Sequence, residues 1–356
     1  MATCAPFDTK ARIFAWSSGR VLLVDAISKT LSRHSGANPS RSAGARPSQR
    51  SRRTHDASGE SSAPSGMRNP VDESNTTPRD GAPPSDGAMS WPDERPPRAI
   101  HEDYLRVGAD IITANSYNTN RGILGLVGLA HKMEDFSRLA VQIARDARDR
   151  LAPEAFVAGS IAPTTRFPGG WNPQRVAPVD NLRREWGDQV TVLARAGADL
   201  ILVETMSAIF QALPAVEAAM QSGLPVFLGV HGTAAGTMSS GETMGELVSS
   251  LDSNGRRVDA ILLMCSSPEA ISATLPNLRA SFPGPVGAYA NIGYRRGNKP
   301  VSYPEDQYFV FETAANTPER YAKYGRQWME MGAQIIGGCC GTTPDHIAAL
   351  RPVMVT

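Results

Sequence analysis

The sequence has no marked excess of charge of either sign and no long apolar run. Its 36 lysine and arginine residues nearly balance its 35 aspartate and glutamate residues, which gives a net charge of +1. A chain without a strong net field is not drawn to nucleic acid or to an anionic membrane surface. No apolar run approaches the roughly 20 residues that a membrane helix needs. These absences favour small-molecule ligands and argue against nucleic-acid or membrane partners.

Cysteine is also scarce, with four residues among 356, two of them adjacent. Small secreted domains that depend on disulfides carry more cysteines, in evenly spaced frameworks. The pattern here suits a reducing compartment, where thiolates remain available for chemistry. We therefore expect a cytoplasmic protein.

The amino-terminal quarter differs in composition from the rest of the chain. Residues 28–98 are rich in Ser, Arg, Pro, Gly and Asp and show almost no aliphatic periodicity. Such a segment buries too little apolar surface to offset its ordering entropy, so we expect it to be disordered. We divide the chain into residues 1–97, which contain one strand-like run at Val21–Asp25, and residues 98–356, which form one barrel domain. The Arg- and Ser-rich start superficially resembles a transit peptide, but the strand-like run argues against one.

After residue 97, short apolar runs alternate with amphipathic helical stretches. The run from His131 to Leu151, for example, keeps the i, i+3, i+4, i+7 spacing of a helix with one apolar face. Eight strands with continuous hydrophobicity, separated by helices, predict an α/β protein with a (β/α)8 barrel. A doubly wound sheet is the alternative, but its Gly-x-Gly-x-x-Gly turn is missing. The expected strands are Val21–Asp25, Ala109–Tyr117, Phe156–Ala162, Ala198–Thr205, Pro225–Gly232, Asp259–Ser266, Pro285–Gly293 and Ala333–Gly341.

Three cysteines fall at the carboxyl ends of two of these strands. Cys265 ends the sixth strand, and Cys339 and Cys340 end the eighth. Active sites of such barrels lie at the carboxyl ends of the strands, and only one strand separates these two. Three converging thiolates predict a Zn2+ ion with an open fourth position, which is typical of a catalytic zinc site. For a single cysteine, burial as a small apolar residue is the alternative.

The local sequence supports this hypothesis. Adjacent residues of a regular strand point to opposite faces, so Cys339 and Cys340 need a distorted backbone, which Gly338 and Gly341 allow. Thr343-Pro344 predicts a helix start whose N–H groups favour thiolates nearby. A thiolate-rich zinc site prefers another sulfur ligand and deprotonates a bound thiol. A hydrolase that activates water uses histidine and carboxylate ligands more often, and the barrel has no His-x-His pair.

The segment from Gly337 to Ile347, GGCCGTTPDHI, resembles the zinc motif of the homocysteine S-methyltransferase family almost residue for residue. The resemblance runs from about His101 to the C-terminus. It implies that Cys265, Cys339 and Cys340 are the catalytic residues and zinc ligands, and that homocysteine sulfur fills the fourth position. The thiolate would then attack the methyl group of an activated donor, giving methionine. Other similar blocks are Gly108–Tyr117, Gly159–Pro163, Gly197–Thr205 and Ser239–Thr243.

The resemblance also assigns substrate-binding residues. It implies that Glu204 holds the amino group of homocysteine, for which a structural salt bridge is the alternative. Asn115 and Tyr117 could line the donor pocket, although core packing is as reasonable for the tyrosine. His231 has no partner at ligand spacing and is at most a pocket residue. The expected partners are homocysteine and a methyl donor. The sequence leaves the donor and the oligomeric state open.

The chain departs from the family pattern in three places. Met264 stands where the family usually has an asparagine, and Val24-Asp25-Ala26-Ile27 lacks the two glycines that usually follow the first-strand aspartate. The low-complexity segment occupies the place of the first helix and its following loop. A zinc-binding relic without methyltransferase activity is therefore an alternative. A redox protein that uses Cys339 and Cys340 as a dithiol is a second one.

Overall fold

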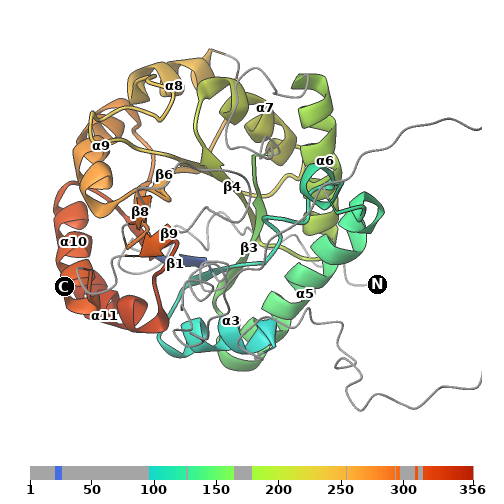
Figure 1. The fold of residues 1–356 in the computed structure, drawn as a ribbon, viewed down its shortest axis with the longest axis horizontal. Helices are drawn as coiled ribbons and strands as arrows, with labels where there is room; N and C mark the ends of the chain where they lie inside the picture. The colour runs from blue at the N-terminus through green and yellow to red at the C-terminus, as the bar shows by residue number, and fades with distance from the viewer. Residues whose placement is uncertain are drawn as a thin grey trace, which may run out of the picture. The chain divides into compact units, whose positions relative to one another are not determined.

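The computed structural model describes residues 21–25, 96–125, 127–163, 179–253, 255–292, 294–296, 309–311 and 316–355. Eight parallel strands of this part close into a barrel in the order β1-β10-β7-β6-β5-β4-β3-β2. Helices surround the barrel on its outer side (Figure 1). The predicted (β/α)8 fold is confirmed. The strands are β1 (Val21–Asp25), β2 (Ile111–Thr113), β3 (Phe156–Ile161), β4 (Leu200–Met206), β5 (Val226–Val230), β6 (Ala260–Met264), β7 (Val286–Ala290) and β10 (Ile335–Gly338).

Each predicted apolar run overlaps one strand, and most of the strands are shorter than the runs. The run Ala109–Tyr117, for example, holds only the three residues of β2, and β10 ends at Gly338, directly before the paired cysteines. The residues that follow the strands leave the ladder and form the loops at the carboxyl end of the barrel. Those loops hold Asn115, Tyr117 and the three cysteines, whereas Glu204 lies within the last residues of β4.

The helices begin where the sequence indicates. The predicted helix at His131–Leu151 is a short 3-10 turn, η3 (Ala130–Lys132), followed by α5 (Met133–Leu151). Among the described helices, none is both long enough and apolar enough to cross a membrane. The remaining elements are α3 (Pro97–Arg106), α4 (Arg121–Gly125), α6 (Val179–Arg195), α7 (Ile209–Met220), α8 (Met244–Asp252), α9 (Pro268–Ser281), α10 (Pro318–Glu330), α11 (Pro344–Val355) and the antiparallel pair β8 (Tyr294–Arg296) and β9 (Phe309–Phe311).

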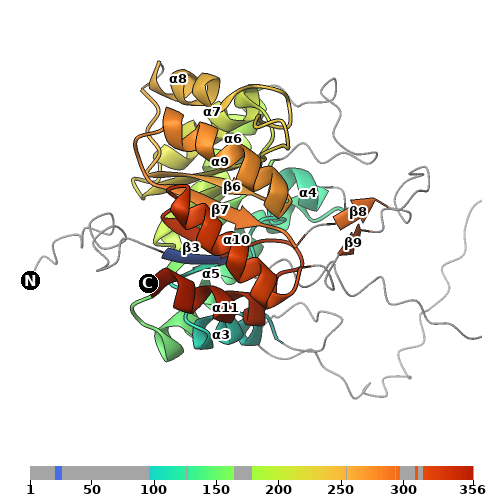
Figure 2. The ribbon, with the colours of Figure 1, turned by 90° about the vertical axis from the view of Figure 1, so that its left-hand side faces the viewer.

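Among the described helices, α3 is the first one after β1. It packs against α5 and α11, and α11 in turn contacts β1 and α10 (Figures 1 and 2). The expectation that the low-complexity segment replaces this helix is therefore wrong. Proline at the first helical position starts α3 at Pro97. Residues 26–95, which lie outside the described part, connect the carboxyl end of β1 to this helix. The disorder predicted for them, and the division at residue 97, stay predictions.

Two apolar clusters stabilise the barrel because successive strand residues face opposite sides. In β4, Leu200 and Leu202 belong to the cluster inside the barrel, and Ile201 and Val203 to the larger cluster between strands and helices. Glu204 is the next residue in the inward series. The inward positions therefore change from apolar to polar as the strand reaches the mouth of the barrel.

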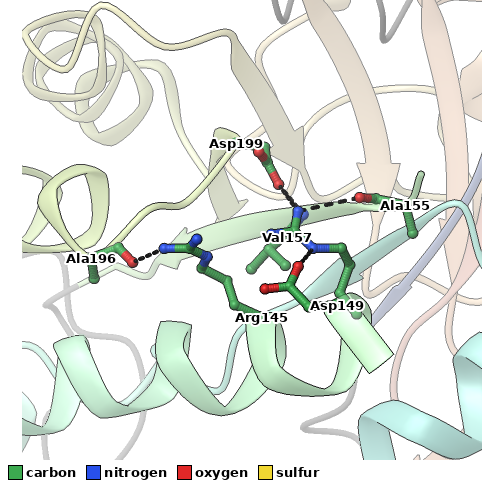
Figure 3. Close-up of polar contacts among 7 residues, drawn as sticks. Arg145, Asp149, Ala155, Val157, Ala196 and Asp199 are labelled. Carbon is green, nitrogen blue, oxygen red and sulfur yellow. Dashed lines mark hydrogen bonds and ion pairs between the residues drawn. The ribbon is translucent and has the colours of Figure 1, made fainter. Parts of the chain in front are cut away.

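The opposite end of the barrel is tied together by polar contacts that involve no predicted site residue. Asp199 accepts hydrogen bonds from the Val157 amide (2.8 Å) and from Arg148 Nη1 (3.0 Å). Arg145 Nη1 donates to the carbonyl of Ala196 at 3.1 Å (Figure 3). These contacts lie at the amino ends of β3 and β4, where barrels carry stabilising rather than catalytic residues. Asp199, in the sequence block Gly197–Thr205, therefore has a structural role.

Candidate active site

The carboxyl ends of β6 and β10 bring three cysteine sulfurs together. Cys265 Sγ lies 2.7 Å from Cys339 Sγ and 3.7 Å from Cys340 Sγ, and the last two are 3.8 Å apart. Sulfurs that share a tetrahedral zinc ion at about 2.3 Å are about 3.8 Å apart. Two of the three separations match this value, and the third pair has to open by about 1 Å. All three cysteines are free thiols.

Cys265 lies in a strained conformation that the neighbouring strand supports. Its φ of 53° is in the left-handed region, which a residue with a Cβ rarely adopts. The Cys265 amide donates to the carbonyl of Tyr289 (3.0 Å). The carbonyl of Cys265 accepts a hydrogen bond from Nδ2 of the buried Asn291 (3.0 Å). Strained residues of this kind persist where the surroundings hold them, often at functional sites. The chain thus turns out of β6 at the residue that carries the sulfur.

Cys340 and Gly341 are the two central residues of a tight turn directly after β10. The Thr342 amide and hydroxyl both donate to the carbonyl of Cys339, at 3.1 and 2.7 Å. Gly341 has φ +79°, as the third residue of a type II turn requires. The expected backbone distortion is therefore a turn that begins after the strand. This turn lets Cys340 join Cys339 on the same side.

The electrostatics of the cluster favour a bound divalent cation. Contact with the sulfurs of Cys265 and Cys340, followed by burial, raises the pKa of Cys339 well above its ordinary value. Three thiolates so close together repel one another, and a soft-sulfur donor set is the kind that zinc accepts. A metal that binds there would displace the thiol protons. The three residues thus fit a zinc ion in donor type and in two of their three separations.

Two residues that the sequence interpretation missed support the loop that carries the cysteines. The hydroxyl of the fully buried Tyr321 lies 2.7 Å from the carbonyl of Gly337 and 2.9 Å from that of Ala290. The His346 ring packs edge-on against Tyr321, with 5.6 Å between ring centroids. Burial lowers the pKa of His346, and its Nδ1 accepts from the amide of Thr343 (3.1 Å). Only His346 had a visible signal, since it belongs to the carboxyl-terminal motif.

The predicted substrate residues lie at the ends of β2 and β4. Glu204 is buried, and Asn115 is half-buried in the loop after β2. The Tyr117 hydroxyl lies 2.9 Å from that of Thr205, so it has a partner within the protein, as the packing alternative expects. The sequence interpretation also missed Thr113, whose buried hydroxyl accepts or donates no hydrogen bond within the described part of the chain.

A cavity of about 240 Å³ opens beside Cys265. Its lining contains one of the predicted site residues, Cys265, together with His231, which the sequence gives as a pocket residue at most. Three serines and an asparagine are among the lining residues, so the cavity suits a polar ligand. The lining residues are His231, Gly232, Ser239, Cys265, Ser266, Ser267 and Asn291.

Comparison with known proteins agrees with this geometry. The model of the family described as homocysteine S-methyltransferase matches residues 88–354. The chain belongs to the homocysteine S-methyltransferase family. This confirms the resemblance drawn from the sequence motifs, and the matched range includes all three clustered cysteines.

Relatives of two lengths match the chain. Methionine synthase of Mycobacterium leprae is 32% identical over 260 residues, which cover 70% of this chain and 20% of that protein. The chain thus spans about a fifth of this relative. Homocysteine S-methyltransferase 4 of Zea mays is 27% identical over 274 residues, which cover 71% of this chain and 78% of that protein.

A solved structure has the same fold. The homocysteine methyltransferase MmuM of Escherichia coli, in its metallated form, matches with a TM-score of 0.58 and 25% identity, over 72% of this chain and 83% of that one. A metal therefore binds to that member of the family. Among the described residues of the present chain, the three cysteines form a cluster that could hold one.

Proposed function

We propose that the protein is a zinc-dependent homocysteine S-methyltransferase, which transfers a methyl group from an activated donor to homocysteine and yields methionine. The observation that carries the proposal is the cluster of Cys265, Cys339 and Cys340 at the mouth of a barrel that belongs to this family. The family membership supports the reaction class. The donor set supports the metal.

The three cysteines would hold the zinc ion. When bound, zinc supplies acidity to a thiol ligand, so that homocysteine reacts as a thiolate near neutral pH. The backbone contacts at Cys265 and the turn at Cys340 preorganise the ligand sulfurs, which lowers the cost of assembling the site.

Glu204 would bind the ammonium group of homocysteine. A carboxylate at a buried position attracts a cation strongly because little water competes for it. The polar cavity beside Cys265 would admit the methyl donor. Its hydroxyl and amide lining, together with His231, supports a polar donor without naming one.

A donor panel with zinc measured on the same sample tests the proposal. Purified protein is assayed for methionine from homocysteine with betaine, S-methylmethionine, S-adenosylmethionine or a methylated corrinoid. We expect about one zinc per chain and methionine with at least one donor. Stoichiometric zinc without methionine from any donor would instead support the zinc-binding relic.

Two variants separate the metal from substrate binding. We expect Cys340→Ala to lose both zinc and activity. Glu204→Gln should keep its zinc, while its KM for homocysteine rises roughly tenfold or more, since a charged hydrogen bond is lost. Activity that survives a chelator but is abolished by alkylation would support the dithiol alternative.

A further inference from the structure

Met264 links the strand that carries the cysteine to the strand that carries the glutamate. It is the last residue of β6 and directly precedes Cys265. Its side chain is fully buried in the cluster inside the barrel, beside Leu262 and Tyr289.

The thioether binds the backbone of a strained residue in β4. Met264 Sδ accepts a hydrogen bond from the Thr205 amide, with 3.2 Å between nitrogen and sulfur. Thr205 has φ +56°, which is unusual for a β-branched residue, and lies in a bulge of β4 between Val203 and Met206. Its hydroxyl is 2.9 Å from that of Tyr117. Two contacts therefore hold Thr205 in a conformation that costs free energy.

Gly229 on β5 provides the space for this sulfur. A Cβ at position 229 would lie 1.9 Å from Met264 Sδ and 3.1 Å from its Cγ, closer than real Cβ contacts allow. Leucine can fill much of the same volume but has no acceptor atom. The contact between Met264 and Thr205 thus depends on both the thioether and the missing side chain on β5.

The amide that Met264 accepts from belongs to the peptide bond between Glu204 and Thr205. Holding that peptide plane in place restrains the backbone on the carboxyl side of Glu204 and so limits the directions in which its side chain can leave β4. We propose that Met264 is a positioning residue for the Glu204 carboxylate and thereby sets the selectivity of the site for a thiol that carries an ammonium group. This inference rests on the proposed function, in which Glu204 binds that group.

The test compares homocysteine with 4-mercaptobutyrate, which is homocysteine without its ammonium group. For Met264→Leu, we expect the KM for homocysteine to rise about five- to tenfold, with kcat within twofold. The kcat/KM for 4-mercaptobutyrate and the zinc content should not change. Gly229→Ala displaces the same sulfur from the other side and should give the same pattern.

Met244→Leu is the matched control, because Met244 is equally buried but lies on α8. This variant should have the same kinetic constants as the wild type for both thiols. The inference would be overturned if Met264→Leu lowered kcat/KM equally for the two thiols, or if its KM for homocysteine were unchanged.

Calorimetric binding of homocysteine, without a donor, separates this inference from the proposed function. If the wild type binds homocysteine but transfers no methyl group, the proposed function fails. In that case, a five- to tenfold weaker Kd in Met264→Leu still supports the positioning role. An unchanged Kd refutes it.

Discussion

Replacing Gly341 by alanine tests whether the turn after β10 controls zinc binding. Gly341 has φ +79°, and a residue with a Cβ costs about 1–2 kcal/mol in this conformation. If the metal-free loop relaxes to avoid the strain, Cys340 moves away from the other two sulfurs. Zinc binding then has to restore the turn, and the same 1–2 kcal/mol corresponds to about a 5- to 30-fold weaker zinc Kd.

Gly223→Ala is the matched control. Gly223 also has a positive φ of +71°, with no atom within 4 Å of an added Cβ, and it lies in the turn after α7. We expect this variant to lose thermal stability, about 2–4 °C per kcal/mol, without any change in zinc affinity. Gly341→Ala should show the reverse, with weak zinc binding and a smaller loss of stability in the metal-free protein.

Zinc affinity is measured by competition with a chromogenic chelator, and stability by thermal unfolding of the metal-free proteins. The reasoning is refuted if Gly341→Ala binds zinc like the wild type and loses as much stability as Gly223→Ala. That result would mean that the turn keeps its shape in the metal-free variant, so that the strain lowers its stability and does not change the position of Cys340.

Three further predictions concern other parts of the barrel. Gly338→Ala would place a Cβ 2.4 Å from Thr342 Oγ1, so chelator competition should show weaker zinc binding. A zinc affinity equal to that of the wild type would mean that Thr342 moves aside without disturbing the cysteines. Burial lowers the pKa of His101 from 6.5 to about 4, so stability is lost as the pH falls below 6.5, by about 2 kcal/mol at pH 5. The fall in melting temperature between pH 7 and pH 5 should therefore be smaller for His101→Gln than for the wild type. An equal fall in both proteins would contradict the link between His101 and acid stability. Thr243→Ala removes the capping box with Glu246 and should cost about 1 kcal/mol in urea unfolding with no loss of zinc; lost zinc would count against a purely local effect.

The sequence predicted the barrel because its signals are local. Each strand is an apolar run of a few residues, and each helix shows its own periodicity, as Met133–Leu151 does. The position of Cys265 and Cys339 at strand ends was equally visible, since a strand end is marked by the residues around it. The cytoplasmic location and the absence of nucleic-acid partners stay predictions.

The first helix was harder to find. Residues 26–95 separate β1 from α3, and a helix of 10 residues after such a segment carries little signal of its own. Only the contacts of α3 with α5 and α11 identify it as the first helix of the barrel. The turn at Gly341 was anticipated as a distortion, but its type depends on backbone dihedral angles that the sequence does not display.

The sequence by itself determined the eight barrel strands and their order along the chain, the family, and which residues stand at the mouth of the barrel. The tertiary structure alone decided which of them meet. Met264 and Thr205 are 59 residues apart in the chain, and their contact follows from the closure and register of the barrel. Periodicity gives the face of a strand on which a residue lies, but only the packing of strands against one another fixes the distance between two side chains.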